Sequence, residues 1–143
     1  MKVSDILQTK GNNVFSVTKQ TTVYDALKSM SEKNIGALLV MDSESLEGII
    51  SERDYARKII LKGKTSHETP VQEIMTDKQK VITVMPEDVL EKCMELMSKH
   101  HIRHLPVVKD DKVFGMVSIG DVVKAIIESQ KETITHLQNY ISQ

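Results

Sequence analysis

Gly48-Ile-Ile-Ser-Glu-Arg-Asp54 sets the organisation of this chain, because a second copy follows as Gly115-Met-Val-Ser-Ile-Gly-Asp121. The same offset of 67 positions matches residues 14–60 with residues 81–127 without a gap. A fixed offset across two whole supersecondary units indicates that one unit was duplicated. Similar folds with similar apolar faces tend to pair about a pseudo-twofold axis, so we expect equivalent polar residues of the two copies to converge near that axis.

The composition indicates an ordinary globular protein of 143 residues, built as one domain or as one domain of two halves. With 40% hydrophobic and 27% charged residues and a net charge of −1, the chain has no global field that would attract nucleic acid or an anionic membrane. Its single cysteine, Cys93, cannot form an internal disulfide. We see no secretory signal and no apolar stretch of membrane-spanning length, and therefore expect a cytoplasmic protein.

Each copy is predicted to run strand, helix, strand, strand, helix. Thr22 and Asp88 are expected to cap the first helices, with acidic partners three residues on. The apolar run 37–41 is expected to be a buried strand. The predicted elements are strands 14–17, 37–41 and 46–50 and helices 22–33 and 51–61 in the first copy, with strands 81–84, 104–108 and 113–117 and helices from Asp88 and Ser118 in the second.

The copies have further common features outside the gapless region. Residues 3–7 resemble residues 71–75, so we expect a short lead-in helix before each copy. Residues 62–70 are a polar linker. We therefore divide the chain into residues 1–70, the first repeat with its lead-in helix and linker, and residues 71–143, the second repeat with an extended C-terminal helix.

The predicted C-terminal helix continues beyond the repeat. Ile127, Ile134 and Ile141 recur every seven residues, with Leu137 between them, on an otherwise polar segment. A seven-residue apolar spacing on an exposed helix is typical of pairing with another helix. A helix folded back onto its own domain explains so short a run equally well.

The duplicated motif places a serine and an aspartate at the start of a helix that follows a strand. Free N–H groups at a helix N-terminus attract phosphate, and the carboxylate can accept hydrogen bonds from the two hydroxyls of a ribose. Gly48 and Gly115 would let a flat base approach the strand backbone. The alternative is an ordinary capping box. In that case replacing Ser51 with alanine costs about 1 kcal/mol of stability and nothing else.

These features together resemble the cystathionine β-synthase (CBS) domain, and the pair resembles a Bateman module. The resemblance extends from Val3 to about Ile127 and rests on the lead-in Val71–Met75, the strand Ile102–Val108 and both copies of the motif. The stretch 34–40 is similar to small stand-alone bacterial CBS-pair proteins and to mitochondrial or plastid relatives in plants. The implied fold class is α/β (α+β), with tandem βαββα repeats packed sheet to sheet about a pseudo-twofold axis.

The resemblance implies that an adenine nucleotide such as AMP, ATP or NAD(H) binds in two clefts between the halves. Ser51 and Asp54 would hold ribose and phosphate in one cleft, and Ser118 and Asp121 in the other. Arg53 has Gly120 as its counterpart, so we expect one cleft to bind better. The other implied ligand residues are the adenine-reading backbone at Ile35, Gly36, Ala37, Ile102, Arg103 and His104, the strand residues Val17, Val84 and Pro106, and the phosphate contacts Arg53, Arg103 and His104.

The sequence gives little support for a metal site, a P-loop or a catalytic serine. His100, His101 and His104 lack the further ligands of a zinc site. Gly63-Lys64-Thr65 lacks the first glycine of a P-loop, and no serine lies in a Gly-x-Ser-x-Gly elbow. We therefore expect a non-enzymatic regulatory module without a catalytic cofactor, forming a homodimer and acting on an unknown effector protein. The alternatives are a purely structural dimerisation module and a cryptic nucleotide-hydrolysing enzyme.

Overall fold

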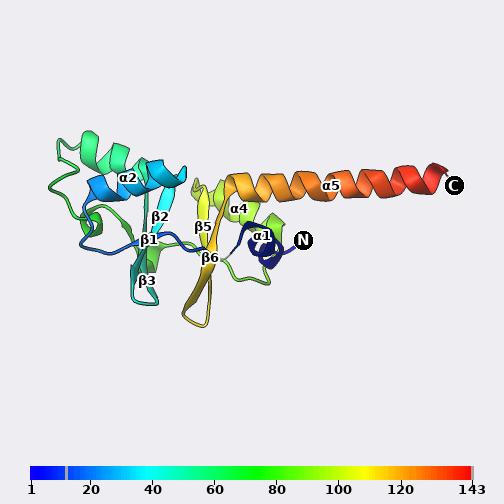
Figure 1. Ribbon diagram of the computed structural model, residues 1–143, viewed down its shortest axis with the longest axis horizontal. Coiled ribbons are helices and arrows are strands. Elements are labelled where there is room, and N and C mark those ends of the chain that lie inside the picture. The colour runs from blue at the N-terminus through cyan, green and yellow to red at the C-terminus, as the bar shows by residue number, and fades with distance from the viewer. Residues whose placement is uncertain (12, 143) are drawn as a thin grey trace. The chain divides into compact units, whose positions relative to one another are not determined.

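The computed structural model describes residues 1–11 and 13–142, which form two compact units (Figure 1). We call them the N-unit and the C-unit. The N-unit contains Asn13–Val81 and Asp110–Val113. The C-unit contains the described residues of Met1–Asn12, Ile82–Lys109 and Phe114–Gln143.

The N-unit is built on a four-stranded sheet in the order β1-β2-β3-β4. β1 runs parallel to β2, and the other pairs are antiparallel. Because β2 is buried over its first four residues, it lies at the centre of the core, as the apolar run predicted. The elements are β1 (Ser16–Val17), α2 (Val23–Lys33), β2 (Ala37–Asp42), β3 (Ser45–Ser51), α3 (Glu52–Tyr55), the π-helical turn η1 (Ala56–Ile60), the 3₁₀ turns η2 (Val71–Glu73) and η3 (Lys78–Lys80), and β4 (Thr76–Asp77).

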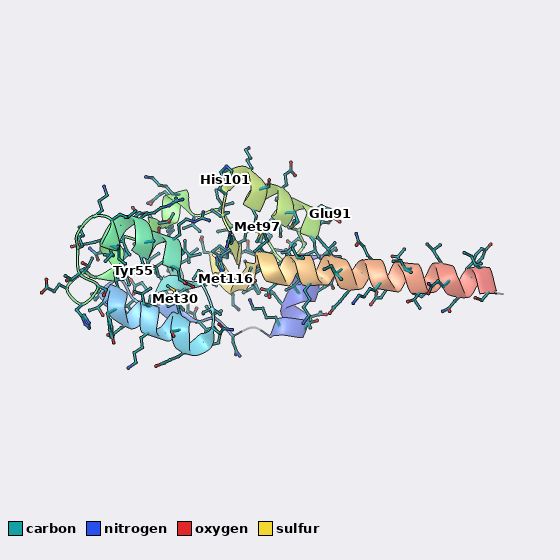
Figure 2. All side chains as sticks on the ribbon, turned by 90° about the horizontal axis from the view of Figure 1, so that it is seen from above. Met30, Tyr55, Glu91, Met97, His101 and Met116 are labelled. Carbon is teal, nitrogen blue, oxygen red and sulfur yellow. The ribbon has the colours of Figure 1, made fainter. Side chains whose placement is uncertain are left out.

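Helix α2 begins and ends where the sequence predicts. The Thr22 hydroxyl accepts a hydrogen bond from the Asp25 N–H at 3.1 Å, which satisfies one of the open donors of the first turn. Asn34 ends the helix in the left-handed conformation. The buried stripe faces the sheet, where Met30 packs in the same core as Tyr55 of α3 (Figure 2).

The C-unit combines a two-stranded antiparallel hairpin with three helices. α1 and α4 both pack against α5. Cys93 is fully buried in this core, as expected for a residue on the apolar stripe of its helix. The elements are α1 (Val3–Lys10), α4 (Leu90–His100), β5 (His104–Lys109), β6 (Lys112–Ser118) and α5 (Ile119–Ser142).

Two local predictions for the second copy were wrong. Asp88 does not cap α4, whose N-cap is Val89. Its carboxylate instead accepts the Met85 N–H at 2.8 Å and pairs with Lys92, because a short acidic side chain can bond to the backbone of the preceding turn as well as to a helix. The predicted strand 81–84 is reduced to a single bridge between Val84 and Val107.

The lead-in segments are exchanged between the two copies. α1 precedes the first copy but packs in the C-unit, where the Val3 N–H donates to the Asp88 carbonyl at 2.8 Å. Val71 begins the second lead-in, a 3₁₀ turn, and donates to the Thr21 carbonyl at 2.8 Å in the N-unit. The division between residues 70 and 71 therefore separates the duplicated sequences, whereas each compact unit contains the lead-in segment of the other copy.

The last helix continues past the repeat to Ser142, as predicted. Side chains stand out along its whole C-terminal half (Figure 2). None of the described helices is both long enough and apolar enough to cross a membrane.

Candidate functional site

In the N-unit, Ser51 and Asp54 form a reciprocal capping box at the start of α3. The Asp54 N–H donates to the Ser51 hydroxyl at 3.3 Å, and the Ser51 N–H donates to Asp54 Oδ2 at 2.9 Å. The Ser51 hydroxyl also bonds to Asp54 Oδ2 at 3.1 Å. The structure therefore confirms that Ser51 and Asp54 cap the helix. A ligand bound at this motif would have to interact with the same hydroxyl and carboxylate.

A lysine accompanies this carboxylate. Lys58 Nζ lies 3.3 Å from Asp54 Oδ1 and donates to the Ile74 carbonyl at 2.8 Å. The Asp54 side chain is only 14% exposed, whereas the Lys58 side chain is 43% exposed.

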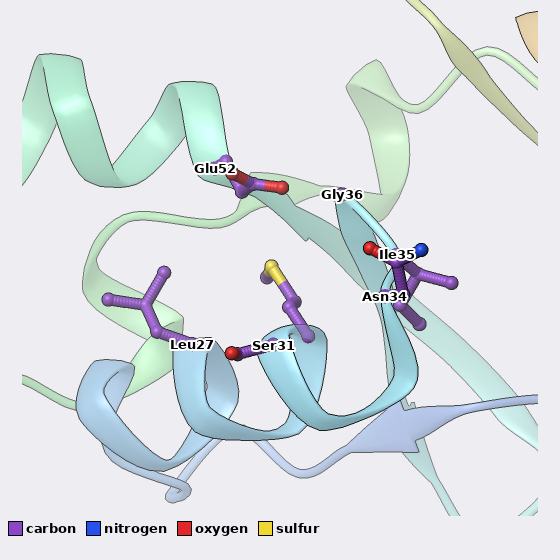
Figure 3. Close-up of a pocket in the computed structure, with 7 residues that line it drawn as sticks. Leu27, Ser31, Asn34, Ile35, Gly36 and Glu52 are labelled. Carbon is purple, nitrogen blue, oxygen red and sulfur yellow. The ribbon is translucent and has the colours of Figure 1, made fainter.

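A cavity of about 370 Å³ opens beside this motif, between α2 and the start of α3 (Figure 3). The Gly36 carbonyl accepts the Glu52 N–H at 3.1 Å, which joins the turn before β2 to the first residue of α3. The predicted residues Ile35 and Gly36 therefore line the same cavity as Glu52 of the motif. Its lining consists of Leu27, Met30, Ser31, Asn34, Ile35, Gly36 and Glu52.

The remaining N-unit candidates lie around the same strands. Val17 of β1 is half-buried and pairs with Val40. Ala37 is fully buried and lies opposite Ser51 in the sheet. Arg53 is exposed in the first turn of α3.

In the C-unit, Ser118 and Asp121 repeat the capping box at the start of α5. The Ser118 N–H donates to Asp121 Oδ2 at 2.9 Å, and the Asp121 N–H donates to the Ser118 hydroxyl at 3.1 Å. Lys10, at the end of α1, donates to Asp121 Oδ2 at 2.7 Å and to the Met116 carbonyl at 2.9 Å. Each motif aspartate therefore pairs with a lysine, but the two lysines come from different elements.

The surroundings of Asp121 and His104 lower the pKa values of both groups. Burial of Asp121 acts to raise its pKa, but the hydrogen bonds from Lys10 and Ser118 outweigh it and hold the pKa below the ordinary value. Burial also lowers the pKa of His104, and the positive charges of Lys10 and Arg103 lower it further. The carboxylate of Asp121 acts in the opposite direction but does not offset these effects, so His104 binds a proton less readily than a free histidine.

The other C-unit candidates divide between surface and core. The Arg103 side chain is exposed, and its carbonyl accepts the Ile119 N–H at 2.9 Å, which holds it beside the start of α5. Ile102 is half-buried. Pro106 is buried, and Val84 is 2% exposed, packs in the core and has its N–H and carbonyl bonded to the backbone of β5.

The motif glycines leave room for other parts of the chain on the side where a β-carbon would lie. A β-carbon on Gly48 would collide with the Thr76 carbonyl, and one on Gly115 would lie 2.9 Å from Leu7 Cδ2. Gly48 therefore makes room for β4 and the end of the second lead-in, and Gly115 makes room for the lead-in helix α1.

Sequence reasoning missed Lys10 and Lys58. The spacing of Lys58 four residues after Asp54 on a helix could have indicated the pair. No local signal connects Lys10 with Asp121, because 111 positions separate them. Among residues 1–11 and 13–142, no group of three or more histidine, cysteine or acidic side chains is arranged to hold a metal ion.

Comparison with known families accounts for the duplication. The family model described as the CBS domain matches residues 3–61 and again residues 71–128. This chain belongs to the CBS-domain family. The tandem CBS repeats predicted from the sequence, and the mixed α/β fold class, are confirmed.

Individual CBS-domain relatives match over most of their length. The mitochondrial protein CBSX3 of Arabidopsis thaliana is 46% identical over 97% of this chain and 71% of its own length. A CBS-domain structure from Burkholderia ambifaria is 47% identical with a TM-score of 0.85, covering 91% of this chain and 96% of that one. PAE2072 of Pyrobaculum aerophilum, solved in complex with AMP, shares the fold at 23% identity and a TM-score of 0.74, over 85% and 89% of the two chains.

Proposed function

We propose that this protein is a non-enzymatic regulatory module that binds an adenine nucleotide at its two Ser-x-x-Asp motifs and passes the binding state to a partner protein. The ligand would bias a conformational equilibrium, and the partner would bind one conformation preferentially. AMP is the first candidate ligand, because the CBS-domain protein PAE2072 was solved with AMP. ATP and NAD(H) offer the same adenosine group and are the other candidates.

The observation that carries this proposal is the repetition of one arrangement in both units. Each motif places a half-buried carboxylate at a helix start, with a lysine ammonium on it. A carboxylate suits the two hydroxyls of a ribose, and an ammonium together with helix N–H groups suits a phosphate. A cap alone requires the serine and the aspartate but not the lysine.

Isothermal titration calorimetry of the full chain with AMP, ATP and NAD⁺ tests the proposal. Asp54→Asn and Asp121→Asn are the decisive variants, because asparagine can still accept the hydrogen bond of the cap but carries no charge. We expect saturable binding of at least one nucleotide, weakened in both variants while their thermal unfolding stays cooperative. The proposal fails if none of the three nucleotides binds the wild-type protein.

A second candidate function, a structural module without a ligand, is favoured by the reciprocal caps, since these already use both motif side chains. It predicts that no nucleotide raises the unfolding temperature. A third, nucleotide hydrolysis, is tested by product analysis after incubation with each nucleotide.

We also propose that α5 forms a homodimer with α5 of a second chain. Only Val122 and Ala125 of this helix are buried, and Ile127, Ile134 and Ile141 are 45%, 54% and 81% exposed. Val123 and Leu137 lie at the intervening positions of a 3.5-residue repeat on the same face, which is interrupted by Gln130. Because an isolated helical segment of this length is marginal in water, pairing would explain the persistence of the helix to Ser142.

A further inference from the structure

Lys10 is positioned at the C-unit motif by a rigid element. Val3, Ile6 and Leu7 of α1 are at most 6% exposed, so the helix is fixed in the core of the unit. Lys10 follows Leu7 by about one helical turn. Its ammonium is therefore held in place before any ligand arrives, which reduces the ordering cost of binding.

The ammonium is also accessible. The Lys10 side chain is 40% exposed and that of Asp121 is 26% exposed, so a ligand at the carboxylate can meet both. The two hydrogen bonds of Lys10, to Asp121 Oδ2 and to the Met116 carbonyl, fix the position of Nζ. An ammonium has three donors, so the third can point to a phosphate oxygen.

The C-unit site has an excess of positive charge. The positive charges of Lys10 and Arg103 lower the pKa of His104, and the carboxylate of Asp121 raises it. Lys10 Nζ lies 2.7 Å from Asp121 Oδ2, and the Arg103 carbonyl is bonded to the Ile119 N–H at the start of the same helix, so two cations accompany one carboxylate.

The N-unit motif contains more acidic charge than the C-unit site. Its cations Arg53, Arg57 and Lys58 are accompanied by the two acids Glu52 and Asp54 on the same segment. The position equivalent to Lys58 in the second copy is Ala125, which is buried, so the C-unit obtains its lysine from α1 instead.

We propose that Lys10 makes the C-unit site selective for nucleotides that carry a diphosphate or triphosphate, over AMP and adenosine. The inference rests on the proposed nucleotide binding and assigns the ligand class of one of its two sites. Lys10 neutralises Asp121, so that the carboxylate can accept ribose hydroxyls without repelling the phosphates. The excess positive charge then attracts each added phosphate charge. The N-unit motif, which has two carboxylates on its segment, discriminates less.

The test compares the affinity of the full chain for ATP, AMP and adenosine by calorimetry. Asp121→Asn and Asp54→Asn assign each binding event to a unit. In Lys10→Met we expect the C-unit affinity for ATP to fall by about tenfold or more, the effect of one charge-assisted hydrogen bond, with less than a twofold change for adenosine. Lys2→Met is the matched control, because it makes the same change at the N-cap of the same helix, about 12 Å away.

The outcomes separate this inference from the function on which it rests. If the wild-type protein binds no nucleotide, both are overturned. If it binds, but Lys10→Met keeps the wild-type ratio of ATP to adenosine affinity, or Lys2→Met changes the ratio equally, the selectivity inference alone is overturned. Lys10→Arg retains the charge and should retain the ratio. Should Lys10→Met not fold, loss of the preference in Lys10→Arg would contradict the inference as long as that variant folds.

Discussion

Leu7 on α1 occupies the space that a β-carbon on Gly115 of β6 would need, with only 2.9 Å between Leu7 Cδ2 and that position. Gly115 also has φ = +154°, a conformation that side chains disfavour. The glycine of the motif is therefore a packing requirement of the lead-in helix, and this helix in turn places Lys10 on Asp121.

Gly115→Ala should destabilise the protein by about 1–3 kcal/mol, because the added methyl group overpacks the contact with Leu7 and strains the backbone. Urea unfolding measures the effect. Gly63→Ala is the control, since Gly63 also has positive φ but nothing lies within 4 Å of its added β-carbon. A cost no larger than that of the control would show that Leu7 yields without strain.

Ser118→Ala should cost about 1 kcal/mol of stability by removing the cap of α5. If the motif also binds nucleotide, the same variant loses affinity at temperatures where it is fully folded. Thermal unfolding with and without AMP and ATP separates the two effects. An unchanged ligand-induced shift would leave Ser118 with a capping role only.

Acid titration should reveal the pair of Lys10 and Asp121. The folded-state pKa of Asp121 is lowered, so the pair stabilises the protein above the unfolded pKa of about 3.9 and loses this contribution as the pH falls through the folded value. Because Lys10 is 40% exposed, we expect no more than about 1 kcal/mol. The stability difference between the wild-type protein and Lys10→Met should be constant above pH 5 and shrink below pH 4. A difference that persists at pH 2 would argue against the ion pair.

Cys93 should be unreactive in the folded protein. Burial raises the pKa of its thiol to about 11, so the thiolate is scarce near neutral pH. A thiol reagent such as Ellman's reagent should therefore react only as fast as the protein unfolds at pH 8, and immediately in 6 M guanidinium chloride, a denaturing concentration for most domains. Immediate reaction in native buffer would be inconsistent with this buried position.

Ile134→Glu should convert a dimer into a monomer, because it places a charge in the middle of the proposed α5 seam. Light scattering after size-exclusion chromatography measures the mass. Thr135→Glu adds the same charge on the neighbouring face and should leave the dimer intact. A wild-type protein that elutes as a monomer across the micromolar range would exclude the seam as a dimer interface.

The repeat, the family and most elements could be predicted because they depend on local patterns. The apolar stripe and Thr22 cap of α2, its end at Asn34 and the Ser-x-x-Asp caps all act within about four residues. Prediction was wrong at Asp88, where two local hydrogen bonds were possible and the preceding turn, rather than the helix, received the carboxylate.

The chain's order of residues was enough to establish the duplication and the two motif aspartates, since these are properties of spacing along the chain. Three-dimensional packing was needed to place each lead-in segment in the unit of the other copy, to give Gly48 and Gly115 their role, and to bring Lys10 to Asp121. These contacts join positions far apart in sequence, and their formation depends on the complementary shapes of whole elements, which no short pattern encodes.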